Sequence, residues 1–382
     1  MSRILIASIA GLLLAGDAIA ALPAPPPEIE DVPVVLLVDL GSGQQLIARQ
    51  ENLSFVPASM TKVMTAYVAF GALASGRLGA DRTYTVGEGT SREWSGKGTS
   101  LYLRPGQEVS VDTLLRGIMT VSANDASVVL AEEYAGSVPV WTAMMNGEAR
   151  RLGMTKSSFN TPNGWPDEGK TFVSARDLVR LASAMIRQYP DLYSRYVGKK
   201  RMTFEGVTRQ SHDPTIEVVE GADGIKTGYT REAGYNFLGS AQRGQRRLVM
   251  VVAGNKTGAQ RAEAARALIE WGFTQWRARP LFAAGKTVAT ARVQGGESRS
   301  VPLAATAPVY AVVPVSGGEK IRLRVRYDGP LEAPVRKGQR VGSLEIVVDN
   351  LPDGRVPLVA AKPVGEAGPL DRIMNGLYGL FS

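Results

Sequence analysis

The chain has no cysteine and only one histidine, His212, among its 382 residues. Disulfide bonds, thiol nucleophiles and cysteine-ligated metals are therefore excluded, as are metal sites built from several histidines. We expect neither a metal nor a cofactor. A Ser-His-Asp triad would have to use His212, but the polar stretch 210–214 is typical of a loop, so we expect a solvated histidine there. A nucleophilic serine would need another base, and lysine is the alternative.

The sequence also lacks a strong excess of charged or apolar residues. Hydrophobic residues make up 44% of the chain and charged residues 21%, as in an ordinary globular protein, which argues against disorder and coiled coil. The 44 basic and 36 acidic residues leave a net charge of +8. We expect this charge to be spread along the chain, so nucleic acid is not an expected partner, whereas anionic lipid or an acidic polymer is compatible with it.

Residues 1–20 have the pattern of a secretory signal peptide. Arg3 supplies the positive start, residues 4–16 form an apolar run, and Ala18-Ile19-Ala20 fits the small-residue cleavage site. The apolar run is too short to span a bilayer comfortably. We therefore predict cleavage after Ala20 and a protein that works outside the cytoplasm.

The length suggests two domains, at about 100–200 residues each. Residues 21–280 mix strands and helices, which predicts an α/β (α+β) domain with an antiparallel sheet and flanking helices. Apolar spacing and capping residues predict helices at 59–74, 110–119, 125–134, 138–152, 174–188 and 260–276. Strands are predicted at 34–38, 44–50, 232–243 and 246–254, with 248–253 buried on both faces, and 80–103 is predicted to form short strands and loops.

Helical patterns stop after Arg279, and short β-like runs between Gly and Pro turns predict a small all-β domain at 281–360. Within it, Ile321–Tyr327 alternates four apolar residues with three arginines.

Residues 361–382 are predicted to form a linker followed by an amphipathic helix. One face of this helix collects the apolar residues Leu370, Ile373, Met374, Leu377, Tyr378 and Phe381. Thirteen residues at ~1.5 Å each cannot cross the ~30 Å core of a bilayer. We therefore expect this helix to lie in a membrane surface, apolar side down, with the protein peripheral to the membrane.

Ser59-Met60-Thr61-Lys62 is the only Ser-x-x-Lys in the chain. Residues three apart on a helix share a face, so Lys62 can reach Ser59. Ser59 begins the predicted helix, where backbone N–H groups favour developing negative charge. A lysine held out of water beside other cations loses its proton readily and can act as a base.

Two further motifs follow in order. Ser122-Ala123-Asn124 falls between two predicted helices, where a hydroxyl can shuttle a proton and an amide can hold a substrate carbonyl. Lys226-Thr227-Gly228 offers a cation, a hydroxyl and a glycine that lets a substrate backbone come close.

Each of these two motifs has a second copy in the chain. Ser158-Phe159-Asn160 is followed by Pro162 and Gly164, which indicate a loop with no preceding helix. Lys256-Thr257-Gly258 follows a buried strand and leads into a helix, so it is predicted to be a turn and an N-cap. We set both copies aside.

With their flanking residues, these motifs resemble the low-molecular-mass penicillin-binding proteins, and in particular the serine-type D-alanyl-D-alanine carboxypeptidases. The resemblance covers about residues 30–280 strongly. It is carried by residues 57–62, 122–126 and 224–230, together with Ala233-Gly234-Tyr235-Asn236 and Trp271-Gly272-Phe273. It implies that residues 21–280 are a transpeptidase-like catalytic domain that trims peptidoglycan pentapeptides and is acylated by β-lactams. It also implies a place at the periplasmic face of a bacterial inner membrane.

The resemblance implies roles for individual residues. Ser59 would attack the penultimate D-Ala carbonyl with Lys62 as proton acceptor, and Ser122 would help to move protons. Substrate would be held by Asn124, Lys226, Thr227, Gly228, Tyr229 and Arg261, the last of these as a reader of the terminal carboxylate. The N–H groups of Ser59 and Tyr229 would form the oxyanion hole. The family often has histidine where this chain has Tyr229, and again where it has Asn163.

Three alternatives remain. A D,D-endopeptidase of the same family would use the same motifs. A class A β-lactamase needs a loop Glu for deacylation, and Glu168 lies in the right stretch but in an unusual sequence context. A non-catalytic cell-wall binding scaffold is disfavoured because all three motifs are intact.

Overall fold

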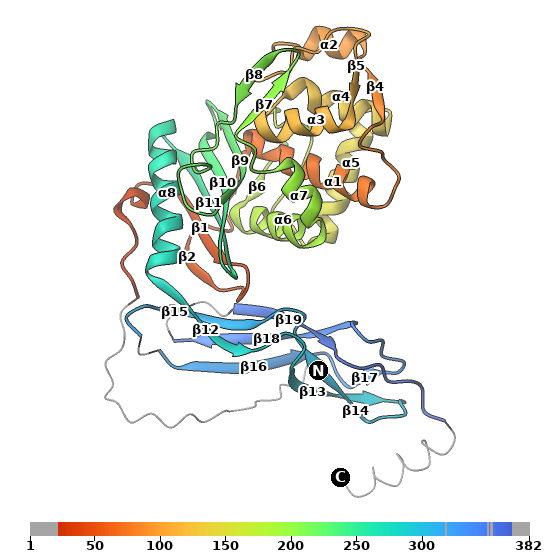
Figure 1. Cartoon of the computed structure of the whole chain (residues 1–382), viewed down its shortest axis with the longest axis vertical. Helices are drawn as coiled ribbons and strands as arrows, with labels where there is room; N and C mark the ends of the chain where they lie inside the picture. Colours follow the sequence, from red (N-terminus) through yellow and green to blue (C-terminus); the bar gives the residue numbers. More distant parts are fainter. Residues whose placement is uncertain (1–21, 318, 350, 352–353, 369–382) are drawn as a thin grey trace, which may run out of the picture. The chain divides into compact units, whose positions relative to one another are not determined.

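In this computed structural model, residues 22–317, 319–349, 351 and 354–368 are described, and they form two compact units (Figure 1). One unit consists of Pro25–Val38 and Ile47–Gly272. The other contains Asp39–Leu46 and the described part of Phe273–Ser382. The predicted signal peptide and the predicted C-terminal helix lie outside the described residues.

The larger unit is built on a five-stranded sheet with the strand order β2-β1-β11-β10-β9. β10 pairs antiparallel with both β9 and β11. Residues 248–253 of β11 are all buried, which confirms the prediction for that strand. The strands are β1 (Val34–Asp39), β2 (Gln45–Arg49), β9 (Ala222–Thr230), β10 (Gly234–Arg243) and β11 (Arg246–Asn255).

Helices cover both faces of this sheet. α8 (Gly258–Thr274) packs closely on one face, because a Cβ on Gly272 would lie only 2.6 Å from Leu248 and 2.8 Å from Leu37. Figure 1 shows α1 (Lys62–Ala74) and α6 (Ala175–Gln188) on the side of the sheet opposite α8. Residues 62–70 of α1 are all buried, so this helix is the centre of the helical layer.

Around α1 lie α3 (Val111–Arg116), α4 (Asn124–Ala135), α5 (Val138–Arg151) and α7 (Pro190–Tyr196). Three short strand pairs complete the unit: β3 (Ser54–Phe55) with β6 (Val173–Ser174), β4 (Thr83–Thr85) with β5 (Glu108–Ser110), and β7 (Arg201–Phe204) with β8 (Val207–Gln210).

The prediction of strands and loops for 80–103 is wrong at α2 (Glu88–Trp94). This helix is short and mostly polar, so its composition resembles that of a loop. Only Ser91 is buried on it, and its hydroxyl donates to the Leu103 carbonyl at 2.7 Å. An ion pair four residues apart, Arg92 to Glu88 at 2.7 Å, also supports it. Tertiary contact therefore stabilises a helix that local apolar spacing does not reveal.

Two other predicted helices begin or end differently in the structure. The first turn of the helix predicted at 59–74 is a 3-10 turn, η2 (Ala58–Thr61). The helix predicted at 110–119 leaves α geometry after Arg116 and continues as a π-helical turn, η3 (Gly117–Val121). Ser122 then reverses the chain at φ 66°, and the Ala123 N–H donates to the Gly117 carbonyl at 3.0 Å.

All regular elements among the described residues from Trp276 onward are strands. β12 (Trp276–Phe282) pairs with β15 (Val309–Pro314). A six-stranded sheet has the order β16-β18-β19-β14-β13-β17. Its strands are β13 (Thr287–Gln294), β14 (Ser300–Ala304), β16 (Ile321–Tyr327), β17 (Leu331–Glu332), β18 (Arg340–Val348) and β19 (Gly354–Ala360). The predicted fold class, a mixed domain with an antiparallel sheet followed by an all-β domain, is confirmed.

Candidate active site

The side chain of Lys62 is completely buried beneath Ser59 at the start of α1. Its Nζ lies 2.9 Å from Ser59 Oγ, 2.7 Å from Asn124 Oδ1 and 2.6 Å from the Asn163 carbonyl oxygen. Asn124 Oδ1 and the Asn163 carbonyl oxygen can only accept hydrogen bonds, so each of them binds one hydrogen of the amine. The remaining position of the amine therefore faces Ser59, the geometry that a serine and its base require.

The surroundings of Lys62 favour a neutral amine. Burial holds the pKa of Lys62 well below its ordinary value, and the positive charge of Lys226 lowers it further. The carboxylate of Asp125 acts in the opposite direction but is the smallest of the three influences. A neutral amine has a lone pair, so Lys62 can accept the hydroxyl proton of Ser59.

The motif Ser122-Ala123-Asn124 is held against the segment 97–99. Thr99 Oγ1 donates to the Ser122 carbonyl at 2.7 Å, and the Asn124 N–H donates to the Thr99 carbonyl at 2.8 Å. Asn124 Nδ2 donates to the Lys97 carbonyl at 2.8 Å, which fixes its amide so that Oδ1 faces Lys62. Ser122 is buried in a left-handed backbone conformation, which is costly without glycine and recurs at functional sites.

Gly228 lets strand β9 lie directly against the turn that carries Ser59. A Cβ on Gly228 would lie 2.4 Å from the Pro57 carbonyl oxygen and 3.3 Å from the Met60 nitrogen. The sequence predicts that this glycine leaves room for a substrate backbone. The structure shows that the backbone at Pro57 already lies too close for any side chain at this position.

Lys226 is buried on the same strand, and its Nζ donates to the Thr227 carbonyl at 3.2 Å. Burial lowers the pKa of Lys226 to about 7, with Asp213 raising it and Arg261 lowering it. Thr227 is buried beside it. Lys226 is therefore a cation that can be deprotonated near neutral pH, close enough to Lys62 to influence its pKa.

Arg261 lies in the first turn of α8. Its Nη2 donates to the His212 carbonyl at 3.3 Å, and its guanidinium lies 5.8 Å from the centre of the Tyr235 ring. Its Nε is buried without a hydrogen-bond partner among the described residues. A guanidinium presents several N–H donors in one plane, so Arg261 is chemically suited to pair with a carboxylate.

Tyr229 is 53% exposed and stacks on Tyr235, with ring centres 4.1 Å apart. Its side chain therefore points away from the buried motifs, and its backbone is the part placed beside Gly228 on β9. His212 lies in a loop, as expected, and is exposed. Desolvation and the charges of Lys226 and Arg261 lower the pKa of His212.

Two groups at this site were missed by reasoning from side-chain motifs. The Asn163 carbonyl accepts from Lys62, but a backbone contact has no signature in side-chain chemistry. Asp125 is buried and accepts hydrogen bonds from Ser100 Oγ at 2.6 Å and from the Leu101 and Leu103 N–H groups at 3.0 and 3.1 Å. It therefore fixes the irregular segment 100–103 beside α4.

The motif copies that we set aside lie elsewhere. Lys256 is exposed between β11 and α8, and Thr257 Oγ1 accepts from the Gln260 N–H at 3.0 Å, which confirms a turn and a cap. Ser158 lies outside the named helices and strands, bridging to Phe172. Glu168, the residue a β-lactamase would need, has an 87% exposed side chain and pairs with Lys170, so it cannot act as a shielded base at Ser59.

Two family models match this chain, one in its mixed helix and sheet part and one in its all-β part. A family model described as D-alanyl-D-alanine carboxypeptidase matches residues 22–257. A second model, described as the C-terminal domain of penicillin-binding protein 5, matches residues 276–366.

Curated relatives match almost end to end. The D-alanyl-D-alanine carboxypeptidase DacD of Salmonella typhimurium is 35% identical over 374 residues, which cover 95% of this chain and 93% of the relative. The D-alanyl-D-alanine carboxypeptidase DacA of Haemophilus influenzae is 34% identical, covering 94% and 92%.

Solved structures are similar as well. Penicillin binding protein 5 from Haemophilus influenzae has a TM-score of 0.74 at 32% identity, covering 90% of this chain and 100% of that one. Penicillin-binding protein D2 from Listeria monocytogenes in its ampicillin-bound form has a TM-score of 0.59 at 28% identity, covering 66% and 100%.

Proposed function

The chain belongs to the D-alanyl-D-alanine carboxypeptidase family of low-molecular-mass penicillin-binding proteins, and from that membership we propose that Ser59 is its nucleophile. The enzyme is a serine-type D-Ala-D-Ala carboxypeptidase: it removes the terminal D-alanine of peptidoglycan pentapeptides through an acyl-enzyme, and β-lactams acylate it. The observation that carries the assignment of Ser59 is the 2.9 Å contact between its hydroxyl and the buried amine of Lys62.

We propose a reaction in which these groups act in turn, supported by the contact between Ser59 and Lys62. Neutral Lys62 takes the proton of Ser59 Oγ while that oxygen attacks the carbonyl carbon of the penultimate D-Ala. The N–H groups of Ser59 and Tyr229 stabilise the resulting oxyanion. Ser122 passes the proton to the leaving nitrogen, and D-alanine departs. Water then attacks the acyl carbon; as the ester bond to Ser59 Oγ breaks, a proton of that water passes to Ser59 through Lys62, while Asn124 holds the substrate amide.

The terminal carboxylate distinguishes an exopeptidase substrate from the interior of a peptide. We assign its recognition to Lys226, Thr227 and Arg261. The first two lie side by side on β9, and the charge of Arg261 reaches Lys226, whose pKa it lowers. Removing such a cation from water is costly, and a substrate carboxylate compensates for that cost.

The activity should depend on pH through Lys226. Its pKa of about 7 means that the cation is present below neutrality and is lost as the pH rises. We expect kcat/KM for a D-Ala-D-Ala peptide to fall above about pH 7, because kcat/KM reports the free enzyme. We expect a weaker fall in kcat, because a bound carboxylate raises the pKa of Lys226 again. Lys226→Arg keeps its charge, so its alkaline fall should disappear; an unchanged fall in this variant would contradict the assignment.

Arg261→Ala should weaken recognition of the terminal carboxylate of the substrate. We expect turnover of a peptide with a free C-terminus to fall by about 10–100-fold, the loss of one charge-assisted contact. Turnover of the same peptide with an amidated C-terminus should change by less than threefold. Arg266→Ala is the matched control, since Arg266 lies on the same helix and its Nε donates to the Pro214 carbonyl at 2.8 Å. Equal losses on both peptides would indicate a purely structural arginine.

We further propose that the enzyme is exported and works at the periplasmic face of the inner membrane, held there by residues 370–382. The support is the signal-peptide pattern of residues 1–20 and the apolar face of the C-terminal segment. Within the described ranges, no helix combines the length and apolar character needed to cross a bilayer.

Deleting residues 369–382, which leaves the β-domain contacts of residues 365–368 in place, tests this attachment. The truncated protein should move from the membrane pellet to the supernatant after centrifugation, while its turnover of a soluble pentapeptide stays within twofold of the full chain. Truncated protein that still sediments with vesicles, or that loses turnover, would show that this segment is not a dispensable anchor.

A further inference from the structure

The positive charge of the chain is concentrated in its C-terminal all-β part, residues 276–366, which we call the β domain. Residues 276–366 contain 14 basic and 8 acidic residues, a net charge of +6 out of the +8 of the whole chain. This corrects the expectation that the charge is spread along the chain. The activity of the catalytic domain does not use this charge, so it requires a separate explanation.

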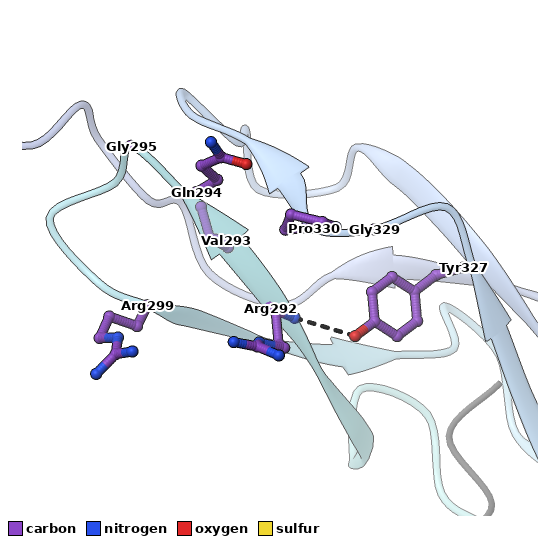
Figure 2. Close-up of a pocket in the computed structure, with 8 residues that line it drawn as sticks. All are labelled: Arg292, Val293, Gln294, Gly295, Arg299, Tyr327, Gly329 and Pro330. Carbon is purple, nitrogen blue, oxygen red and sulfur yellow. Dashed lines mark hydrogen bonds between the residues drawn. The ribbon is translucent and has the colours of Figure 1, made fainter. Parts of the chain in front are cut away.

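Two of these cations line a cavity of about 760 Å³ between β13, the turn that follows it, and the loop after β16. Figure 2 shows Arg292 and Arg299 on the same side of the β13–β14 hairpin, with the Tyr327 ring beside Arg292 and Gln294 pointing the other way. Both arginines are exposed. The cavity is therefore open to solvent and bordered by two guanidinium groups.

The frame of this cavity is held by hydrogen bonds from backbone N–H groups. The Val293 N–H donates to the Arg299 carbonyl at 2.8 Å, which closes the hairpin. The Arg292 N–H donates to Tyr327 Oη at 3.3 Å. A Cβ on Gly329 would lie 2.3 Å from the Tyr327 ring, so glycine is needed where the loop passes over that ring. The arginines and the tyrosine thus project from a fixed scaffold.

None of the residues that line the cavity is acidic. Glu297, in the hairpin turn, accepts the Gly365 N–H at 2.9 Å and is engaged there. Asp328 and Glu332 are exposed on the neighbouring segment but do not line the cavity. The residues that line the cavity therefore include two positive charges and no negative charge, which favours an anion.

We propose that this cavity binds carboxylate groups of the peptidoglycan polymer, giving the enzyme a second point of attachment to the wall. The choice of polymer rests on the proposed function. A guanidinium pairs with a carboxylate through two parallel hydrogen bonds, and peptidoglycan stem peptides repeat that group. Tyr327 and Pro330 add an apolar wall for the adjoining part of the ligand.

A second attachment on the same chain makes binding at the catalytic site effectively intramolecular. It raises the local concentration of substrate without any change at Ser59. Membrane lipid is a poorer match, because a lipid-binding surface exposes apolar side chains beside its cations, whereas these arginines border a concave cavity with a single aromatic ring.

The test compares polymeric and soluble substrate on the full mature chain. R292Q/R299Q removes both cations of the cavity. R336Q/K337Q is the matched control, since it removes two exposed cations of the same domain that do not line the cavity. D-Ala release is measured from a soluble pentapeptide and from insoluble, pentapeptide-rich sacculi, and a thermal melt of each variant reports folding.

We expect R292Q/R299Q to match the wild type on the soluble peptide and to be about tenfold slower on sacculi at sub-saturating amounts, a difference that shrinks with added salt. The control should match the wild type on both. Equal loss in the control, wild-type rates of R292Q/R299Q on sacculi, or weaker binding of R292Q/R299Q only to phosphatidylglycerol vesicles would each overturn the proposal. Failure of the wild type to release D-Ala from either substrate would instead count against the proposed function.

Discussion

Lys62→Ala is expected to lower the rate of acylation by benzylpenicillin by about 10³-fold, equivalent to ~4 kcal/mol of transition-state stabilisation. The buried amine lies 2.9 Å from Ser59 Oγ, and its lowered pKa makes it the group beside that hydroxyl that can take the proton. Without it, Ser59 would have to lose its proton to water, a far weaker base than a neutral amine. Stopped-flow or quenched-flow acylation kinetics measure this loss directly.

The variant also leaves Asn124 Oδ1 and the Asn163 carbonyl without their donor, which costs about 1–3 kcal/mol for each buried group left unpaired. A thermal melt must therefore show that the variant remains folded at the assay temperature. Lys256→Ala, in the exposed second copy of Lys-Thr-Gly, should acylate at the wild-type rate. A folded Lys62→Ala enzyme that keeps more than about a tenth of the wild-type rate would exclude Lys62 as the base.

The pairing of Ser59 with Lys62 could be predicted from the sequence because it depends on a short local spacing. Residues three apart lie on one face both in an α-helix and in a 3-10 turn, so the pairing survives the change of geometry in η2. Its burial was not predictable in the same way, because the sheet and the Asn163 loop that enclose Lys62 come from parts of the chain about 100 residues or more away.

Contacts in which one partner is a backbone group could not be predicted from the sequence. The Asn163 carbonyl binds Lys62 whatever side chain residue 163 carries. The sequence predicts a role for Gly228 in substrate approach, whereas its packing against Pro57 brings together two distant segments and only the fold reveals it. Gly164 is similar, since a Cβ there would lie 1.9 Å from the Ala58 carbonyl oxygen.

In the β domain, the strands could be predicted from the sequence but the cavity could not. Its strands were predictable because the alternation in Ile321–Tyr327 and the regular Gly and Pro turns are local signals. The cavity beside Arg292 could not be predicted, because it brings together strands that are not neighbours in the sheet. Tyr327 belongs to β16, at the opposite end of the strand order from β13. The loop that follows Tyr327 depends on Gly329 for its course.

The central claim is that one serine, Ser59, carries the acyl group. A β-lactam presents a strained amide in the place of the D-Ala-D-Ala bond, and the acyl-enzyme that forms keeps the whole drug. Intact-mass spectrometry after incubation with benzylpenicillin therefore counts the adducts and, by comparison of variants, identifies the residue that carries them.

We expect one adduct per chain in the wild type and none in Ser59→Ala. Ser158→Ala, which removes the serine of the other Ser-x-Asn, should carry one adduct like the wild type. A benzylpenicillin adduct that persists in Ser59→Ala would contradict this account of the active site.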